Sequence, residues 1–161
     1  MALEKTGKDS LIVIISNRGP FSFTQKENGE YDVERGAGGL VTALGALAEK
    51  HEVLWIASAM SADDRKWAKE NANETQKVEG IYLRLVRPNE AAYEKYYGII
   101  ANPMLWFIQH QLWDAPRTPS ITEEIWDAWE TGYLPINKLL AKAVIESLQG
   151  VERPVIILPQ D

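Results

Sequence analysis

Arg18 is the residue of this sequence best suited to bind a phosphate group. It follows the apolar run Leu11 to Ile15, whose three isoleucines predict a strand buried on both faces. Gly19 and Pro20 then end the strand, because proline cannot continue a central ladder. The planar guanidinium of arginine donates paired hydrogen bonds to a phosphate. An arginine at the carboxyl end of a buried strand therefore indicates an anion-binding site.

A glycine-rich segment, with Gly36, Gly38 and Gly39, comes before an apolar stretch from about 40 to 49 that predicts a helix. Free N–H groups and the helix dipole attract anions to a helix N-terminus, and glycines let a ligand approach the backbone. The spacing is not G-x-G-x-x-G, whose third glycine would fall at Val41, and no Walker Gly-Lys-Ser/Thr follows. The alternative interpretation is a tight turn that packs the helix onto a sheet.

Strands and helices alternate along the rest of the chain. Further buried-strand patterns occupy Glu52–Ser58, Gly80–Val86 and Val155–Leu158, and a charged helix is predicted from Ala62 to about Asn73. This alternation predicts an α/β fold: a Rossmann-like, mostly parallel sheet flanked by helices. Asn28-Gly29 predicts a short inserted β-hairpin, which we interpret as a surface ornament in preference to a flap over a site.

The second half of the chain has a helical character. Helices are predicted from Glu90 to Tyr97, from Met104 to Trp113 and over 121–148, and 98–103 is taken as a connection. His110 is expected to be a hydrogen-bonded core residue. An aromatic and aliphatic stripe at three- and four-residue spacing is assigned to the core, and it consists of Trp126, Trp129, Tyr133, Ile136, Leu140, Val144 and Leu148.

Composition excludes several classes of protein. The 161 residues carry a net charge of −6 with no basic stripe, which argues against nucleic-acid binding. The absence of cysteine excludes disulfides and thiolate metal sites. No apolar run approaches the ~20 residues of a transmembrane span. We expect one domain over 1–161, a cytoplasmic location, and a piece of a longer protein, because the last strand pattern stops directly at its tip.

Taken in order, these segments resemble the N-terminal part of retaining glycosyltransferases of the trehalose-6-phosphate synthase family. Such enzymes have the GT-B arrangement of two Rossmann-like domains facing a cleft. The resemblance implies that this chain is the acceptor-side domain and that the C-terminal donor domain is absent. The matching stretches span nearly the whole chain: Ser16-Asn17-Arg18, Gly38-Gly39-Leu40, Val53–Ile56, Tyr96-Tyr97, Asn102, Leu105-Trp106, His110, Tyr133, Asn137 and Asp161.

The resemblance implies a function and a set of site residues. The full-length enzyme would transfer glucose from a nucleotide sugar, UDP-glucose or similar, to glucose 6-phosphate, retaining the anomeric configuration, and the chain alone would be inactive. No catalytic residue, metal or cofactor is implied. The implied acceptor-binding residues are Arg18, Tyr97, Trp106 and Asp161, and the implied donor diphosphate-binding residues are Gly38 and Gly39.

Two departures from the family pattern keep alternatives open. Ala57 and Ser58 follow Trp55 where the family often has a second aromatic residue, and the chain ends at Gln160-Asp161 within the family's His-Asp-Tyr-His pattern. The stretch Ser16-Asn17-Arg18-Gly19-Pro20 also resembles a branch of the family that includes pseudo-glycosyltransferases, so one alternative is a pseudo-glycosyltransferase-like relative with a different acceptor. The other alternative is a non-catalytic sugar-phosphate-binding module. The expected partners are small molecules, a sugar phosphate and a nucleotide sugar, with no nucleic acid and no membrane. An open cleft face would favour a homo-oligomer.

Overall fold

The structure, a computed structural model, divides the chain into two compact units. The first comprises residues 1–87 and 142–161 and the second residues 88–141. The expectation of one domain over 1–161 stays a prediction. In the part that is described, no helix is long and apolar enough to cross a membrane. The described residues are 10–36, 41–42, 47–48, 50–111 and 120–160.

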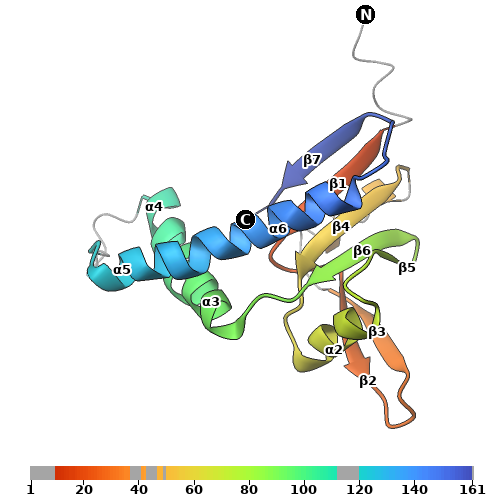
Figure 1. Cartoon of the computed structure of the whole chain (residues 1–161), viewed down its shortest axis with the longest axis horizontal. Helices are drawn as coiled ribbons and strands as arrows, with labels where there is room; N and C mark the ends of the chain where they lie inside the picture. The colour runs from red at the N-terminus through yellow and green to blue at the C-terminus, as the bar shows by residue number, and fades with distance from the viewer. Residues whose placement is uncertain (1–9, 37–40, 43–46, 49, 112–119, 161) are drawn as a thin grey trace, which may run out of the picture. The chain divides into compact units, whose positions relative to one another are not determined.

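The first unit is built on a five-stranded sheet in the order β5-β6-β4-β1-β7 (Figure 1). Neighbouring strands among β6, β4, β1 and β7 are parallel, and only β5 runs antiparallel to β6. This confirms the predicted mostly parallel sheet. The sequence did not predict β5, a three-residue edge strand without an apolar pattern. The strands span Leu11–Ser16 (β1), Val53–Ser58 (β4), Gln76–Val78 (β5), Ile81–Val86 (β6) and Val155–Pro159 (β7).

The core of this unit follows the two central strands. All six residues of β4 are buried, and so are five of the six residues of β1. Ile14 pairs with Trp55 in the parallel register, and both side chains are completely buried. Because parallel strands run in one direction, their carboxyl ends meet at the same edge of the sheet. The register therefore brings the residues after β1 and those after β4 to one edge.

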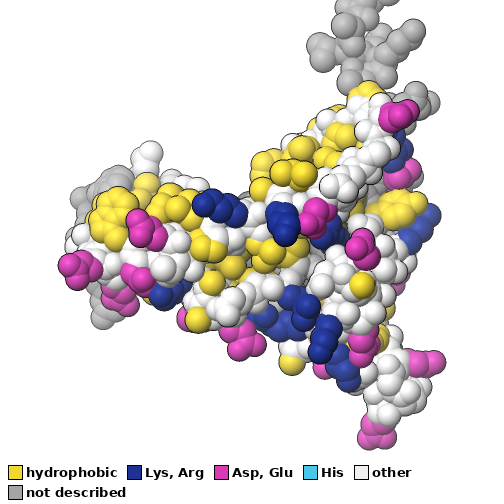
Figure 2. All heavy atoms as spheres, in the orientation of Figure 1, with side chains coloured by type: hydrophobic (Ala, Val, Ile, Leu, Met, Phe, Trp, Pro, Cys, Tyr) yellow, Lys and Arg dark blue, Asp and Glu magenta, His cyan; other side chains and the backbone are white. Residues whose placement is uncertain are grey.

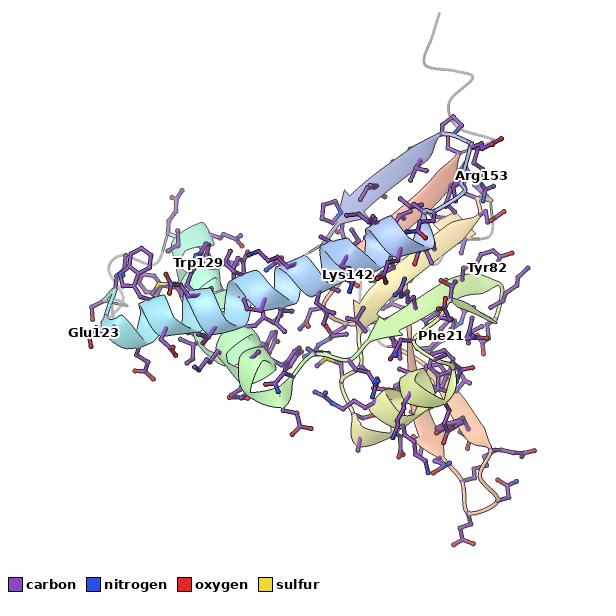
Figure 3. The ribbon with its side chains drawn as sticks, in the orientation of Figure 1. Phe21, Tyr82, Glu123, Trp129, Lys142 and Arg153 are labelled. Carbon is purple, nitrogen blue, oxygen red and sulfur yellow. The ribbon has the colours of Figure 1, made fainter. Side chains whose placement is uncertain are left out.

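The edge strand β7 is less covered than the centre. Figure 2 shows hydrophobic side chains gathered at its surface, where Ile156 and Ile157 are 37% and 47% exposed. Arg153, which lies two residues before β7 and is labelled in Figure 3, forms an ion pair with Glu52. The pKa of Arg153 is raised, chiefly by its hydrogen bond to this carboxylate. The pair thus links the segment before β7 to the segment before β4.

Helical segments connect these strands. Of the helix predicted over about 40–49, the described residues Val41, Thr42, Leu47 and Ala48 are helical, and the others lie outside the described residues. Helix α2, Ala62–Glu70, begins at a capping box, in which the Ser61 hydroxyl accepts from the Asp64 N–H and the Asp64 carboxylate accepts from the Ser61 N–H.

The C-terminal turns of α6, which spans Leu134–Ser147, are anchored to the sheet by Arg84 of β6. Its guanidinium donates to the Ala143 carbonyl at 3.0 Å, to the Ser147 hydroxyl at 2.9 Å and to the Glu146 carboxylate at 2.5 Å. The hydrogen bond from Arg84 is the main reason why the pKa of Glu146 is lowered. A single side chain of β6 thereby holds three residues of the helix.

Strands β2 (Phe21–Gln25) and β3 (Tyr31–Arg35) form the predicted hairpin. Gly29 in its turn has φ +85°, the left-handed conformation that glycine readily adopts. The expectation of a surface ornament is wrong for β2. Phe21 and Phe23 are 4% and 2% exposed, and Phe23 stacks on Trp67 of α2 with 4.0 Å between ring centroids. Alternation along β2 puts both phenylalanines on one face, and α2 covers that face.

A pH-dependent contact links the hairpin to α2. The Tyr31 hydroxyl donates to the Glu70 carboxylate at 2.8 Å. Partial burial, and then this hydrogen bond, raises the pKa of Tyr31 to about 12. The phenol of an unfolded chain titrates near pH 10, so the contact stabilises the fold fully below about pH 10 and loses this contribution as the pH rises toward 12. We expect alkaline titration to destabilise the wild type more than Tyr31→Phe, as measured by urea unfolding. Parallel losses in the two proteins would contradict the assignment.

The second unit is helical, with two π-helical segments. Residues 98–103, taken from the sequence as a connection, are part of the π-helix η1, so that expectation is wrong. The buried residues Tyr96, Ile100 and Met104 recur every four positions and hold this segment helical despite Gly98 and Pro103, because packing supplies most of a helix's stability. The elements of the second unit are α3 (Glu90–Glu94), η1 (Lys95–Leu105), α4 (Trp106–Gln109), α5 (Glu123–Ala128), η2 (Trp129–Tyr133) and the start of α6.

The predicted core stripe is only partly buried. Ile136, Leu140 and Val144 are buried, as expected, but Trp126 is 58% exposed and does not belong to the core. The π-helix η2 lies between Trp126 and Ile136, and its wider turn changes which residues share a face. His110 is also exposed, not a core residue, although its Nδ1 lies 2.7 Å from the Trp106 carbonyl oxygen.

Candidate functional site

The carboxyl ends of the parallel strands are joined by backbone hydrogen bonds. The Ser58 N–H, at the end of β4, donates to the Asn17 carbonyl at 3.2 Å. On one side of β4, the Ala59 N–H donates to the Val86 carbonyl of β6 at 2.8 Å, and on the far side of β1 the Gln160 N–H donates to the Ile15 carbonyl at 2.7 Å. The residues that follow four different strands therefore form one continuous edge.

Arg18 lies at this edge, as the sequence predicts. Its residue is exposed, while the preceding Ser16 and Asn17 are buried at 2% and 5% exposure. Within the described part of the chain, no residue forms a hydrogen bond or ion pair with the Arg18 guanidinium. A guanidinium with this exposure can receive an anion without first giving up a partner.

The beginning of the glycine-rich segment lies against the turn that carries Arg18. The Gly36 N–H donates to the Pro20 carbonyl at 2.8 Å. A Cβ atom at Gly36 would lie 3.3 Å from the Gly19 carbonyl oxygen, so the glycine permits a close approach of the two backbones. Gly38 and Gly39 lie outside the described residues. The next described residues, Val41 and Thr42, are helical. The structure thus brings Arg18 and the start of the glycine-rich segment together.

Tyr97 and Trp106 belong to the second unit. Tyr97 of η1 is half-buried and stacks on Tyr93 with 6.2 Å between ring centroids. Trp106 is 50% exposed, so it is not a core residue, and it stacks on His110 at 4.2 Å. An exposed aromatic face of this kind can pack against a sugar ring. Asp161, the other predicted acceptor residue, lies outside the described residues, directly after Gln160.

The sheet edge also contains polar groups to which sequence reasoning assigned no role. Ser58 is 2% exposed, and its Oγ has no hydrogen-bond partner among the described residues. Ser16 Oγ accepts from the Trp55 indole at 2.7 Å and donates to the Arg18 carbonyl at 2.6 Å. The available signal was the strand pattern: a buried tryptophan needs a partner for its N–H, and Ser16 is the polar residue at the end of the neighbouring strand.

The chain is similar to known proteins over nearly its whole length. The model of a protein family described as "Glycosyltransferase family 20" matches residues 10–161. The chain is 28% identical over 146 residues to the alpha,alpha-trehalose-phosphate synthase [UDP-forming] A of Dictyostelium discoideum, covering 90% of this chain and 18% of that protein. It is 31% identical over 131 residues to the trehalose-6-phosphate synthase of Mycolicibacterium smegmatis, covering 81% of this chain and 23% of that protein.

A solved structure has the same fold. It is described as trehalose-6-phosphate from E. coli bound with UDP-2-fluoro glucose, and it superposes with a TM-score of 0.58 at 21% identity. The superposition covers 93% of this chain and 27% of that structure. The GT-B-type fold is therefore confirmed for the region that this chain represents. The chain spans between 18% and 27% of the length of these three relatives.

Proposed function

We propose that the chain, which belongs to glycosyltransferase family 20, forms the acceptor side of a retaining glycosyltransferase of the trehalose-6-phosphate synthase type. The full-length protein would transfer a glucosyl group from UDP-glucose to glucose 6-phosphate. In this transfer the bond from C1 to the diphosphate oxygen breaks and a bond from C1 to an acceptor hydroxyl oxygen forms. The O–H bond of that hydroxyl breaks, so UDP and one proton are released. The observation that carries the proposal is the exposed Arg18 at the sheet edge. Its turn lies against Gly36, the beginning of the glycine-rich segment.

The roles of the residues follow from their chemistry. Arg18 would hold the phosphate of glucose 6-phosphate by paired hydrogen bonds, and Tyr97 would donate a further one. Trp106 would line the acceptor pocket, and Asp161 would accept from the hydroxyl groups of the sugar. The segment with Gly38 and Gly39 would stabilise the charge of the leaving diphosphate through backbone N–H groups, a contribution that grows as the bond breaks.

The remaining expectations are part of the same proposal. We expect no metal or organic cofactor, because backbone donors and cations of the full-length protein would stabilise the diphosphate. We also expect a cytoplasmic protein that acts on small molecules and forms a homo-oligomer. Among the described residues, no group of three or more potential metal-ligating histidine, aspartate or glutamate side chains occurs.

Calorimetric titration with glucose 6-phosphate tests the proposal. We expect the wild type to bind and Arg18→Ala to bind about 100-fold more weakly, because two charge-assisted hydrogen bonds are lost. Lys69→Ala, which removes one positive charge from the last turn of α2, serves as the matched control and is expected to change the affinity by less than about twofold. Glucose without a phosphate is expected to bind wild type and Arg18→Ala alike. Equal affinity of wild type and Arg18→Ala for glucose 6-phosphate would overturn the proposal.

A further inference from the structure

Trp55, Ser16 and Arg18 form a chain of side-chain hydrogen bonds from the core to the sheet edge. The indole Nε1–H of Trp55 donates to Ser16 Oγ at 2.7 Å, and Ser16 Oγ donates to the Arg18 carbonyl at 2.6 Å. The direction is defined, because an indole N–H donates only and a carbonyl oxygen accepts only. Ser16 therefore donates its single hydroxyl proton to the Arg18 carbonyl oxygen.

The strand register explains why these groups meet. Ile14 of β1 is paired with Trp55 of β4, and Ser16 lies two residues after Ile14, on the same face of the sheet. Trp55 is completely buried, so its N–H cannot reach water and needs a partner in the protein. Ser16, itself 2% exposed, is that partner. Burial in the core fixes the Trp55 side chain, and the hydrogen bond from its N–H fixes the Ser16 hydroxyl.

The turn after β1 is held at three of its carbonyl groups. The carbonyl of Asn17 accepts from the Ser58 backbone, and the carbonyl of Pro20 accepts from the Gly36 backbone. Arg18 is the residue between them whose carbonyl is held by a side chain, that of Ser16. A substitution of Ser16 can therefore remove the hydrogen bond to the Arg18 carbonyl, whereas the other two carbonyls are bound by backbone N–H groups.

From this geometry we infer that Trp55 and Ser16 are positioning residues for Arg18: they hold its backbone so that the guanidinium is aimed at the phosphate of the acceptor sugar. The inference rests on the proposed function of Arg18. A long flexible side chain on a fixed backbone loses less conformational entropy on binding than one on a mobile turn, so the restraint raises the affinity for a sugar phosphate. Neither positioning residue contacts the ligand.

Substitutions that remove the restraint test the inference by calorimetry with glucose 6-phosphate. We expect Ser16→Ala and Trp55→Phe to weaken binding by about 5- to 10-fold, since the contacts between Arg18 and the ligand remain possible and the preorganisation of Arg18 is lost. Trp67→Phe is the matched control: Trp67 is also a buried tryptophan of this unit, but its ring stacks on Phe23. It is expected to leave the affinity within about twofold of the wild type.

A double-mutant cycle separates positioning from general loss of structure. In the Arg18→Ala background, Ser16→Ala is expected to cause no further loss of affinity, because its effect acts through Arg18. The ligand is also expected to shift the indole N–H resonance of Trp55, identified by its disappearance in Trp55→Phe, and not that of Trp67.

The outcomes distinguish this inference from the proposed function. If the wild type does not bind glucose 6-phosphate, or Arg18→Ala binds it equally well, the proposed function fails and the inference fails with it. If binding depends on Arg18 but Ser16→Ala and Trp55→Phe bind like the wild type, only the positioning role is overturned. Additive losses in the double-mutant cycle would also overturn it.

Discussion

Gly132→Ala will lower the free energy of unfolding by about 3 kcal/mol, although alanine normally stabilises a helix relative to glycine. A Cβ atom at Gly132 in η2 would lie 2.5 Å from Lys95 Cβ, 2.8 Å from the Tyr96 backbone nitrogen and 3.0 Å from the Ala92 carbonyl oxygen. Backbone and Cβ atoms cannot rotate out of the way. The two π-helical segments must therefore separate, which disturbs the stacking of Tyr96 on Tyr133 at 5.7 Å.

Gly98→Ala is the matched control for this effect. Gly98 lies in the other π-helical segment, and its added Cβ would meet the Glu94 carboxylate oxygen at 2.8 Å. That atom is the end of a flexible, exposed side chain, so it can move at little cost. We expect Gly98→Ala to be neutral or to stabilise by up to about 1 kcal/mol. Urea unfolding of both variants provides the measurement, and equal effects would contradict close packing at Gly132.

Asp64→Ala will destabilise the first unit by about 3 kcal/mol, because it removes two charge-assisted hydrogen bonds from a buried position. Asp64 is 4% exposed. Its Oδ1 accepts from the Phe23 N–H of the hairpin at 2.9 Å, and its Oδ2 accepts from the Ser61 N–H at the start of α2, also at 2.9 Å. Without the carboxylate, the Phe23 N–H is buried without this partner, and α2 loses half of its capping box.

Asp63→Ala removes the neighbouring carboxylate and serves as the control. The Asp63 carboxylate accepts from the Gln25 N–H at 3.1 Å in a partly buried place, so we expect a loss of about 1 kcal/mol. Urea unfolding compares the two variants. Hydrogen exchange at the Phe23 amide locates the effect, since Asp64→Ala should accelerate this exchange and Asp63→Ala should not. The account of the hairpin would be refuted by two variants of equal stability with unchanged exchange at Phe23.

The fold class was predictable because its signals are local. The continuous apolar runs of β1 and β4 are typical of strands buried on both faces, and Asn28-Gly29 is a strong signal for a hairpin turn. The position of Arg18 at the sheet edge was predictable for the same reason. An arginine directly after a buried strand must lie where that strand ends, whatever its neighbours in space are.

The helical half was predicted less well, because π-helical segments have no simple sequence pattern. A regular 3.6-residue period assigned Trp126 to the core together with Ile136, and η2 between them breaks that period. In the same way, Gly98 and Pro103 are signals for a connection, but the packing of Ile100 keeps the chain helical between them. Tertiary contacts outweigh local propensity at these positions.

By itself, the sequence determined the parallel α/β architecture, the family and the arginine that follows β1, because each of these depends on short segments and on their order along the chain. Only the tertiary structure decided that Trp55 reaches Ser16 and that Gly36 approaches Pro20. Those contacts join positions 39 and 16 residues apart (55 − 16 and 36 − 20). They depend on strand register and on the path of the hairpin, which emerge only when the sheet and its connections pack together.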